Sequence, residues 1–401
     1  MGMSQSTSPL APEELLTAVD GVMEDLTAFR EDLHRHPELS WQEFRTTEKI
    51  EAKLKAHGLE RIYRPLETGL VGEVNFSAGA PFLLFRADID ALPLPDEKNV
   101  PYRSQHPGVC HACGHDVHTT VMLGAAILAR RLNLAGKYNL RFVFQPAEEP
   151  IPSGAPKMIE KGVLGGVTYA LGMHLEPRLP LGTVALTPGW VNLQSIRLDL
   201  TLTGPGGHSA RPEETADLLW LASRMVQDSY QMVYRTLDLR TSPVILTFTE
   251  IHAGEGYNVI PRELRLTGTL RLADPQKKEA FLHRFSELLK GLESTGGCRI
   301  EWSYREGAPA IYNDPDLIHL LQQAAAQDFP ISVHIDRTFR TPGADDFSYY
   351  AREVPGAMVR FGSRTEHHTA GLHEGTFDVP PEVIRLGVLF FLHQIRFLQQ
   401  Q

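Results

Sequence analysis

The chain has little cysteine, no basic run and no long apolar stretch. Three of its 401 residues are cysteine, and this low, odd number does not build a disulfide framework, so we expect a reducing compartment. The net charge is -10, and no cluster of lysine and arginine offers a surface to nucleic acid or to an anionic membrane. No apolar run approaches the roughly 20 residues of a membrane-spanning helix. Residues 1–9 lack the charged start and apolar centre of a secretory signal. We expect a cytoplasmic protein without nucleic-acid or membrane partners.

Length and composition favour two domains. A chain of 401 residues with 42% hydrophobic content can bury a large core. Residues 1–188 alternate helical and strand-like segments, which predicts βαβ units and a mostly parallel sheet. The pattern changes near Gly189, and the alternation returns after residue 305. We predict an α/β domain, 1–188 and 306–401, interrupted by an inserted α+β domain, 189–305.

Hydrophobic periodicity places the segments. In the α/β part it predicts helices at 12–33, 42–56, 119–132, 154–161, 314–327, 345–352 and 381–399, and strands at 70–76, 82–86, 140–145, 169–173, 183–186 and 357–361. The insert is predicted to follow the order β-α-β-β-α-β. Its first strand, 194–203, alternates apolar and polar residues, and we expect it to be an exposed edge of the inserted sheet.

Metal-binding side chains follow several of the predicted strands. The segment His111-Ala-Cys-Gly-His115-Asp-Val-His118 places a thiol, imidazoles and a carboxylate immediately before an apolar helix. Similar side chains recur after predicted strands: Asp88, Asp90, Glu148, Glu149, His174 and His373. The carboxyl ends of parallel strands share one edge of a sheet, where ligands collect. Cys, His and carboxylates bind borderline transition metals, so the combination predicts a metal site at this edge.

Each element alone has an ordinary structural interpretation. A lone buried histidine usually satisfies a backbone hydrogen bond, and adjacent glutamates are usually one exposed and one capping carboxylate. Cys110 and Cys113 form a C-x-x-C pair, which is also found in redox sites and zinc knuckles. No second C-x-x-C accompanies this pair, and we interpret Cys110 as a bystander.

The motifs also resemble a known family. The matching segments, in chain order, are Arg86-Ala-Asp-Ile-Asp-Ala-Leu-Pro93, His111-Ala-Cys-Gly-His-Asp116, Phe144-Gln-Pro-Ala-Glu-Glu149, Gly206-Gly-His-Ser209, Asn258-Val-Ile-Pro261 and Gly343-Ala-Asp-Asp-Phe347. They are similar to those of the hippurate hydrolase and N-acyl-amino-acid amidohydrolase group, within the aminoacylase and glutamate carboxypeptidase family of dinuclear metallopeptidases. The resemblance runs from about His34 to the last predicted helix. It implies a metallopeptidase domain with an inserted lid that makes a homodimer.

The resemblance implies residue roles in the larger domain. Two divalent ions (zinc, manganese, cobalt or nickel) would be held by Cys113, His115, Glu149, His174 and His373. Glu148 would be the general base that acts on a metal-activated water, and Asp90 would orient a metal ligand. Asp88 stands where the carboxypeptidase branch has a histidine ligand, and its role stays open. Pro150 and the loop 367–371 depart from the family pattern, which puts the substrate in doubt.

The resemblance also implies roles in the lid. His208 would stabilise the oxyanion, and Asn258 and Arg271 would hold the free carboxylate of a small N-acyl amino acid. Because His208 lies in the insert and the predicted ligands do not, we expect His208 to act on the active site of the partner subunit. The alternatives are a dipeptidase or carboxypeptidase of the same family, a catalytically silent metal-binding homologue, and a cysteine hydrolase with Cys113 as nucleophile and His115 as base.

Overall fold

The computed structural model describes residues 10–401, so the prediction about a secretory signal falls outside the described residues. The described chain forms two compact units. The catalytic unit comprises the chain up to Val191 together with Tyr312–Arg340 and Asp346–Gln401, and the inserted unit comprises Asn192–Ile311 and Thr341–Asp345.

The catalytic unit is built on an eight-stranded sheet in the order β1-β2-β4-β3-β5-β16-β6-β15. The central strands β4, β3, β5 and β16 are parallel, and antiparallel pairs flank them. The prediction of an α/β fold with a mostly parallel sheet is therefore confirmed. The strand bounds are β1 Arg61–Tyr63, β2 Leu70–Val74, β3 Phe82–Asp88, β4 Asn139–Gln145, β5 Val167–Pro180, β6 Thr183–Ala185, β15 His334–Asp336 and β16 Gly356–Arg364.

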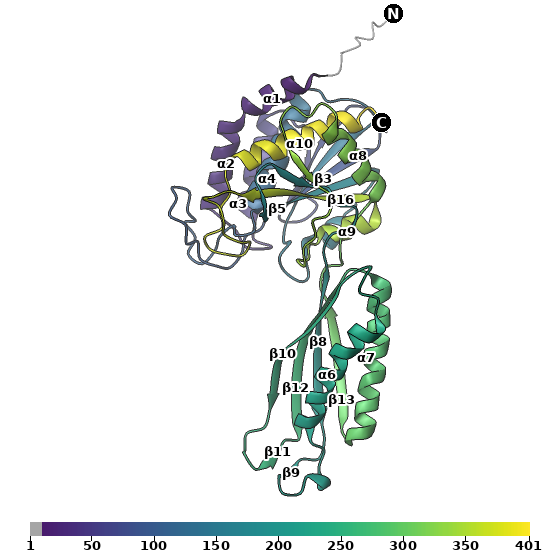
Figure 1. The fold of residues 1–401 in the computed structure, drawn as a ribbon. Helices are drawn as coiled ribbons and strands as arrows, with labels where there is room; N and C mark the ends of the chain where they lie inside the picture. The colour runs from purple at the N-terminus through teal and green to yellow at the C-terminus, as the bar shows by residue number, and fades with distance from the viewer. Residues whose placement is uncertain (1–9) are drawn as a thin grey trace, which may run out of the picture. The chain divides into compact units, whose positions relative to one another are not determined.

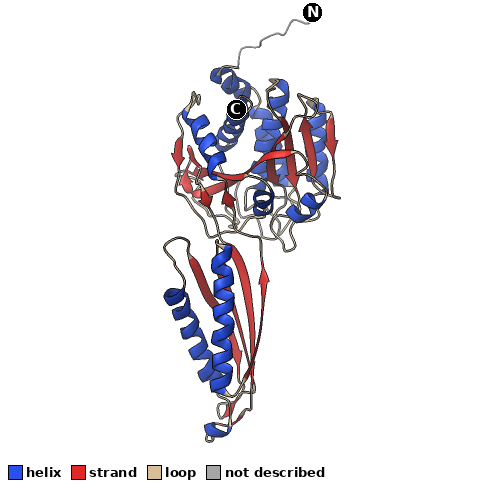
Figure 2. Cartoon of the chain, turned by 90° about the vertical axis from the view of Figure 1, so that its right-hand side faces the viewer, coloured by secondary structure: helices blue, strands red, loops and turns tan. Residues whose placement is uncertain are grey.

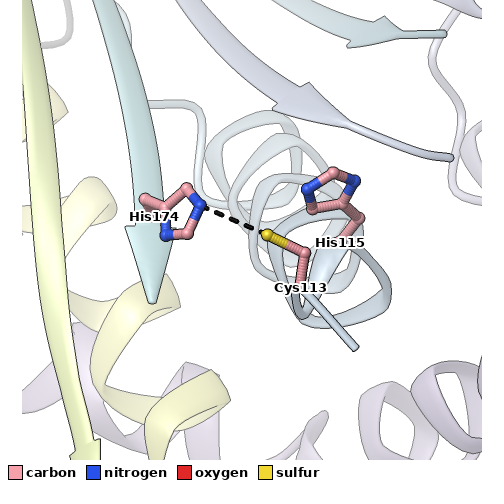
Figure 3. Close-up of side chains that lie close together, drawn as sticks. All are labelled: Cys113, His115 and His174. Carbon is pink, nitrogen blue, oxygen red and sulfur yellow. Dashed lines mark hydrogen bonds between the residues drawn. The ribbon is translucent and has the colours of Figure 1, made fainter. Parts of the chain in front are cut away.

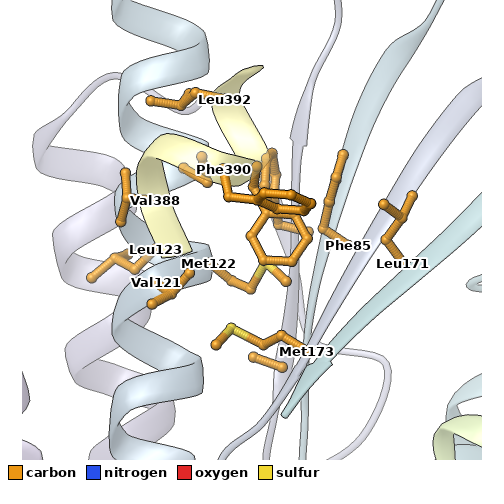
Figure 4. Packing of buried hydrophobic residues seen from close by; sticks show 14 of the residues in the cluster. Phe85, Val121, Met122, Leu123, Leu171, Met173, Val388, Phe390 and Leu392 are labelled. Carbon is orange, nitrogen blue, oxygen red and sulfur yellow. The ribbon is translucent and has the colours of Figure 1, made fainter. Parts of the chain in front are cut away.

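Helices cover this sheet, with α10 and α9 on opposite sides of β16 (Figure 1). Their bounds are α1 Pro12–Asp20, α2 Met23–Arg35, α3 Phe44–Ala56, α4 His115–Arg131, α5 Gly154–Glu160, α8 Pro315–Ala326, α9 Phe347–Glu353 and α10 Glu382–Leu398. Side chains of α4 and α10, such as Met122 and Phe390, pack toward Phe85 and Met173 of the strands (Figure 4). This apolar layer fixes the sheet against the helix that begins at His115.

The inserted unit is a four-stranded antiparallel sheet with two long helices (Figure 2). Its strands are β8 Gln194–Thr203, β10 Val244–Ala253, β12 Glu263–Leu272 and β13 Arg299–Glu306, and its helices are α6 Leu218–Thr236 and α7 Pro275–Gly296. Apolar residues of these elements form a separate core. The strand order is β10-β12-β8-β13, so the prediction that residues 194–203 form a sheet edge is wrong. Strand β8 is paired on both sides.

The observed unit boundaries differ slightly from the predicted ones. Gly189–Trp190 forms strand β7, which pairs with β14, Tyr312–Asn313, and this pairing keeps both segments in the catalytic unit. Residues Thr341–Asp345 join the inserted unit, where Arg271 Nη1 donates to the Pro342 carbonyl at 3.0 Å. Contacts between residues far apart in the sequence set these boundaries.

Three predicted segments also needed correction. The helix expected at 12–33 is two helices, because the chain turns at Gly21. Strand β3 extends through Asp88, so Asp88 lies in the strand and not after it. Strand β5 continues to Pro180, so His174 lies within the strand and does not end it. Within residues 10–401, no helix is long and apolar enough to cross a membrane.

Candidate metal centre

Cys113, His115 and His174 lie together in the catalytic unit. Cys113 lies two residues before His115, the first residue of α4, and His174 comes from β5. All three are buried, and each offers one ligand atom within 4.8 Å of the others. Figure 3 shows the Cys113 thiol directed toward the His174 ring, with Sγ 3.6 Å from Nε2. These three predicted ligands therefore form one compact donor set.

Gly114 makes this arrangement sterically possible. Its φ is 84°, in the left-handed region that glycine adopts without strain. A Cβ at this position would lie 2.5 Å from Cδ1 of Leu175. Glycine between Cys113 and His115 thus lets the loop approach β5 and turn directly into α4.

Hydrogen bonds orient both histidine rings. Nδ1 of His115 lies 2.9 Å from the Asp90 carbonyl oxygen, and Nδ1 of His174 lies 2.6 Å from the Leu175 carbonyl oxygen. A carbonyl can only accept, so both protons are on Nδ1, and Nε2 of each ring has its lone pair available. His115 Nε2 is buried without a hydrogen-bond partner. The tautomers therefore suit metal binding through Nε2.

Glu149 and His373 form a second group with Cys113. The ligand atoms of these three residues also lie within 4.8 Å of one another, and His373 Nε2 is 3.5 Å from Glu149 Oε1. The Glu149 Oε1 atom is buried without a hydrogen-bond partner. The His373 side chain is 53% exposed, which places this group on the solvent side of the site. Cys113 belongs to both groups.

The electrostatics of the site favour a cation. Burial disfavours the charged form of His115, but Asp88, Cys113 and the hydrogen bond to Asp90 together outweigh burial and raise the His115 pKa well above its usual value. Burial and the Arg360 guanidinium lower the pKa of His174 well below its usual value. Burial raises the pKa of Glu149 to about 7. The carboxylates that favour a proton on His115 also favour a divalent ion, which must displace such protons to bind.

A strained turn presents the two glutamates. Ala147 has a φ of 53°, which is uncommon for a residue with a side chain. Its N–H donates to Glu43 Oε1 at 2.8 Å, and its carbonyl accepts from the Gly154 N–H at 2.7 Å. Glu43 is fully buried, and burial together with Asp90 raises its pKa to about 7. Glu43 thus holds the peptide that directly precedes Glu148.

A second buried network lies behind the glutamates. Arg86 donates to Asp88, to Asp346 and, through Nε, to Gln145 Oε1 at 3.0 Å. The Asp346 N–H in turn donates to Glu148 Oε1 at 3.4 Å. Asp346 lies in one of the motifs quoted above, but sequence reasoning gave it no role. Glu43 carried no sequence signal, since only the packing of α3 brings it to Ala147.

The candidates His208, Asn258 and Arg271 lie in the inserted unit. His208 is exposed and pairs through β9, Gly207–His208, with β11, Val259–Ile260. Asn258 directly precedes β11, and its carbonyl accepts from the Ser209 N–H at 3.1 Å. Arg271 lies on β12. The structure thus places His208 and Asn258 on neighbouring segments of the small β9–β11 sheet, whereas Arg271 lies on the four-stranded sheet.

The donors in the catalytic unit fit a pair of divalent ions. Thiolate, imidazole and carboxylate form a mixed set of the kind that binds zinc and neighbouring transition metals. Buried polar atoms without a partner are rare in folded proteins, and here His115 Nε2 and Glu149 Oε1 face the same centre. Bound cations would satisfy both atoms.

Comparison with known proteins places the chain in a family. Residues 84–396 match Peptidase family M20/M25/M40. A Bacillus subtilis (strain 168) protein named N-acetylcysteine deacetylase is 33% identical over 367 residues, which cover 91% of this chain and 94% of that protein. A Bacillus velezensis N-acetyldiaminopimelate deacetylase is 33% identical over 368 residues, 91% of this chain and 96% of its own length. A solved Bacillus subtilis structure, described as a dinuclear metal binding peptidase from the M20 family, has a TM-score of 0.82 and 30% identity and covers 94% of this chain and 99% of its own. The chain belongs to peptidase family M20/M25/M40.

Proposed function

We propose that this protein hydrolyses the amide bond of N-acyl amino acids and releases a carboxylic acid and a free amino acid. Membership of the family, with deacetylases among its relatives, makes the chain a metal-dependent amidohydrolase. The observation that carries the proposal is the pair of ligand groups that share Cys113 beside Glu148.

We assign the ions to these two groups. Cys113, His115 and His174 would hold one ion, and Cys113, Glu149 and His373 would hold the other. When bound, divalent cations acidify a water molecule and polarise the scissile carbonyl. Zinc, manganese, cobalt and nickel are the candidates.

Glu148 is the proposed general base. Its carboxylate stands next to the ligand Glu149, and a backbone N–H from Asp346 contacts its Oε1. Glu148 takes the proton from the attacking water and then transfers it to the nitrogen as the C–N bond breaks. Asp90 keeps His115 oriented through Nδ1, with Oδ1 at 3.2 Å, and Ser40 donates to its other oxygen at 2.7 Å.

The inserted unit supplies the proposed substrate contacts. His208 would donate to the oxyanion that forms when water attacks the carbonyl. Asn258 and Arg271 would bind the free carboxylate of the amino acid, since a guanidinium matches a carboxylate in two parallel hydrogen bonds. A substrate with a free carboxylate is thereby favoured over the corresponding amide or ester.

We further propose a homodimer formed through the inserted unit, in a cytoplasmic protein. Strand β10 ends the order of the inserted sheet, and it exposes Ile245 and Ile251 by 43% and 53%. An edge strand with apolar side chains is suited to pair with a second copy about a twofold axis. In that dimer His208 would act on the partner subunit.

A substrate panel tests the proposed activity. The metal-free protein is reloaded with zinc, manganese, cobalt or nickel in turn and assayed against N-acetyl, N-benzoyl and indole-acetyl amino acids and against dipeptides, with Glu148→Gln as the control for contaminating hydrolases. We expect cleavage of N-acyl amino acids that a chelator abolishes. Preference for dipeptides would favour the peptidase alternative, and no turnover with any metal would favour a silent homologue. Activity that survives chelation would point to Cys113 as a nucleophile.

A further inference from the structure

Asp88 is fully buried and already uses both of its carboxylate oxygens. Oδ2 accepts from Arg86 Nη1 at 2.7 Å, and Oδ1 lies 2.7 Å from Nδ1 of His118. His118 is also fully buried. The ligand atoms of Asp88, His115 and His118 lie within 4.8 Å of one another, as they would in a metal site. The hydrogen bonds of Asp88 and His118 decide whether these two residues bind an ion or position other groups.

The tautomer of His118 follows from its other partner. The Leu175 N–H, which can only donate, points to His118 Nε2 at 3.0 Å. Nε2 therefore accepts, and the proton is on Nδ1, which donates to Asp88. Both ring nitrogens are committed, so His118 has no lone pair left for an ion. Each Asp88 oxygen likewise already accepts a hydrogen bond, Oδ2 from Arg86 and Oδ1 from His118.

His118 replaces a missing strand partner. The pairing of β3 with β5 ends at Arg86 and Gly172, and Leu175 lies three residues further along β5. A buried N–H without an acceptor costs about 1–3 kcal/mol. Beyond the last paired residues of β3 and β5, His118 Nε2 is the acceptor for the Leu175 N–H.

Leu175 is the residue through which His118 reaches the metal ligands. Its carbonyl accepts from Nδ1 of the ligand His174 at 2.6 Å, and this bond leaves Nε2 directed at Cys113. The Leu175 side chain packs against Gly114, where an added Cβ would lie 2.5 Å from Cδ1. A shift of the Leu175 backbone would therefore turn the His174 ring and loosen the loop that carries Cys113 and His115.

We infer that Asp88 and His118 are a positioning pair, which holds the backbone of Leu175 so that His174 presents Nε2 to the ion shared with Cys113 and His115. The inference rests on the proposed metal site and assigns Asp88 a role other than ligation. Outer groups of this kind alter metal affinity by about ten- to a hundredfold.

Two substitutions of His118 separate its two hydrogen bonds. Asparagine can place a donor near the position of Nδ1 but does not reach Leu175, whereas glutamine can place an acceptor near the position of Nε2. We expect His118→Asn to raise the dissociation constant for Zn²⁺ by about ten- to a hundredfold and to change the visible spectrum of the Co²⁺-loaded protein. His118→Gln should recover most of the affinity and the spectrum of the wild type. Affinity is measured by titrating metal-free protein against a chromophoric chelator.

The controls separate positioning from a general loss of structure. His393 is buried on α10, and His393→Asn measures the cost of replacing a buried histidine; it should leave metal affinity unchanged. The melting temperature of each metal-free variant is recorded, and we expect similar values for His118→Asn and His118→Gln. Equal metal affinity in these two variants, whether lowered or not, would overturn the inference.

Asp88→Asn provides an independent test, because asparagine keeps an oxygen acceptor for His118. We expect the number of ions per chain to match the wild type, with weaker affinity. Loss of one ion per chain would overturn the inference, since Asp88 would then be a ligand. A wild-type protein that binds no divalent ion would instead refute the metal site itself, so the two failures are distinguishable.

Discussion

The two units bury different kinds of residue. The catalytic unit buries charged and titratable groups near its candidate site, among them Arg86 and Asp88 on β3 and His115 at the start of α4. The core of the inserted unit is apolar, and charges on its sheet form surface pairs, such as Arg197 with Asp199 at 2.8 Å. A buried charge is costly unless it is paired and hydrogen-bonded. In the catalytic unit, ion pairs and hydrogen bonds therefore hold the buried site residues in place. The inserted unit is held together mainly by its apolar core.

This difference separates two classes of candidate residue. Buried partners orient the ligands of the catalytic unit, so substitutions there should change metal binding. His208 is exposed, and Arg271 is only partly buried, so substitutions in the inserted unit should change catalysis or substrate binding and leave the metal in place. Each prediction below tests this separation, beginning with the largest expected effect.

Replacing Cys113 should have the largest effect. Cys113→Ser removes the thiolate that both ligand groups share, so we expect metal content and activity to fall to background. Cys110→Ser is the matched control, because Cys110 is equally buried and lies outside both groups. Burial raises the pKa of both thiols, that of Cys110 to about 11, so only a bound cation would make Cys113 a thiolate. Metal analysis and activity of both variants decide the assignment, and the reverse pattern would mean that Cys110 is the bridging residue.

The two adjacent glutamates should behave differently. Glu148→Gln should lower kcat by about two to four powers of ten because proton transfer is lost, with metal content unchanged. Glu149→Gln should lower metal content as well, since Glu149 belongs to the group with Cys113 and His373. Metal analysis of the purified variants accompanies the kinetics. Equal metal loss in both would contradict the division of roles.

His208 tests the inserted unit. His208→Ala should lower turnover by about two to three powers of ten, with unchanged metal content, because none of the proposed ligands lies in this unit. Mixing this variant with Glu148→Gln under conditions of subunit exchange should restore part of the activity, since a mixed dimer has one complete site. Exchange without any recovery would show that His208 does not act across the dimer.

Arg271 should show the smallest effect. A hydrogen bond to a charged group contributes about 1.5–3 kcal/mol, so Arg271→Ala should raise KM by about ten- to a hundredfold, with little change in kcat. Arg265 is the control on the same strand, because it is paired with Glu263 at 2.8 Å on the surface. KM is measured by steady-state kinetics for an N-acyl amino acid and for its amide, which lacks the carboxylate. The rise in KM caused by Arg271→Ala is then compared between the two substrates. An equal rise in KM for both substrates would refute carboxylate binding by Arg271.

The candidate ligands could be predicted because their chemistry is local. The segment from His111 to His118 combines Cys113 and His115 with the glycine that lets them turn into α4, and these properties depend on neighbouring residues. The alternation of strands and helices likewise indicated a parallel sheet whose strand ends bring distant ligands together. Periodicity therefore predicted the fold class, whereas residue type and the resemblance to the family suggested which side chains meet at the site.

Tertiary structure decided what periodicity leaves open. The alternation of apolar and polar side chains shows that residues 194–203 have one buried face. A central strand and an edge strand share this pattern, so only the pairing of β8 with β12 and β13 reveals that it is central. The end of β5 depends on its neighbour β16, and the role of Glu43 depends on the packing of α3. His118 was visible as an imidazole, but only the N–H of Leu175 fixes which of its nitrogens carries the proton. Residue type and spacing thus determine the chemistry available, whereas the direction of each hydrogen bond depends on contacts between segments far apart in the chain.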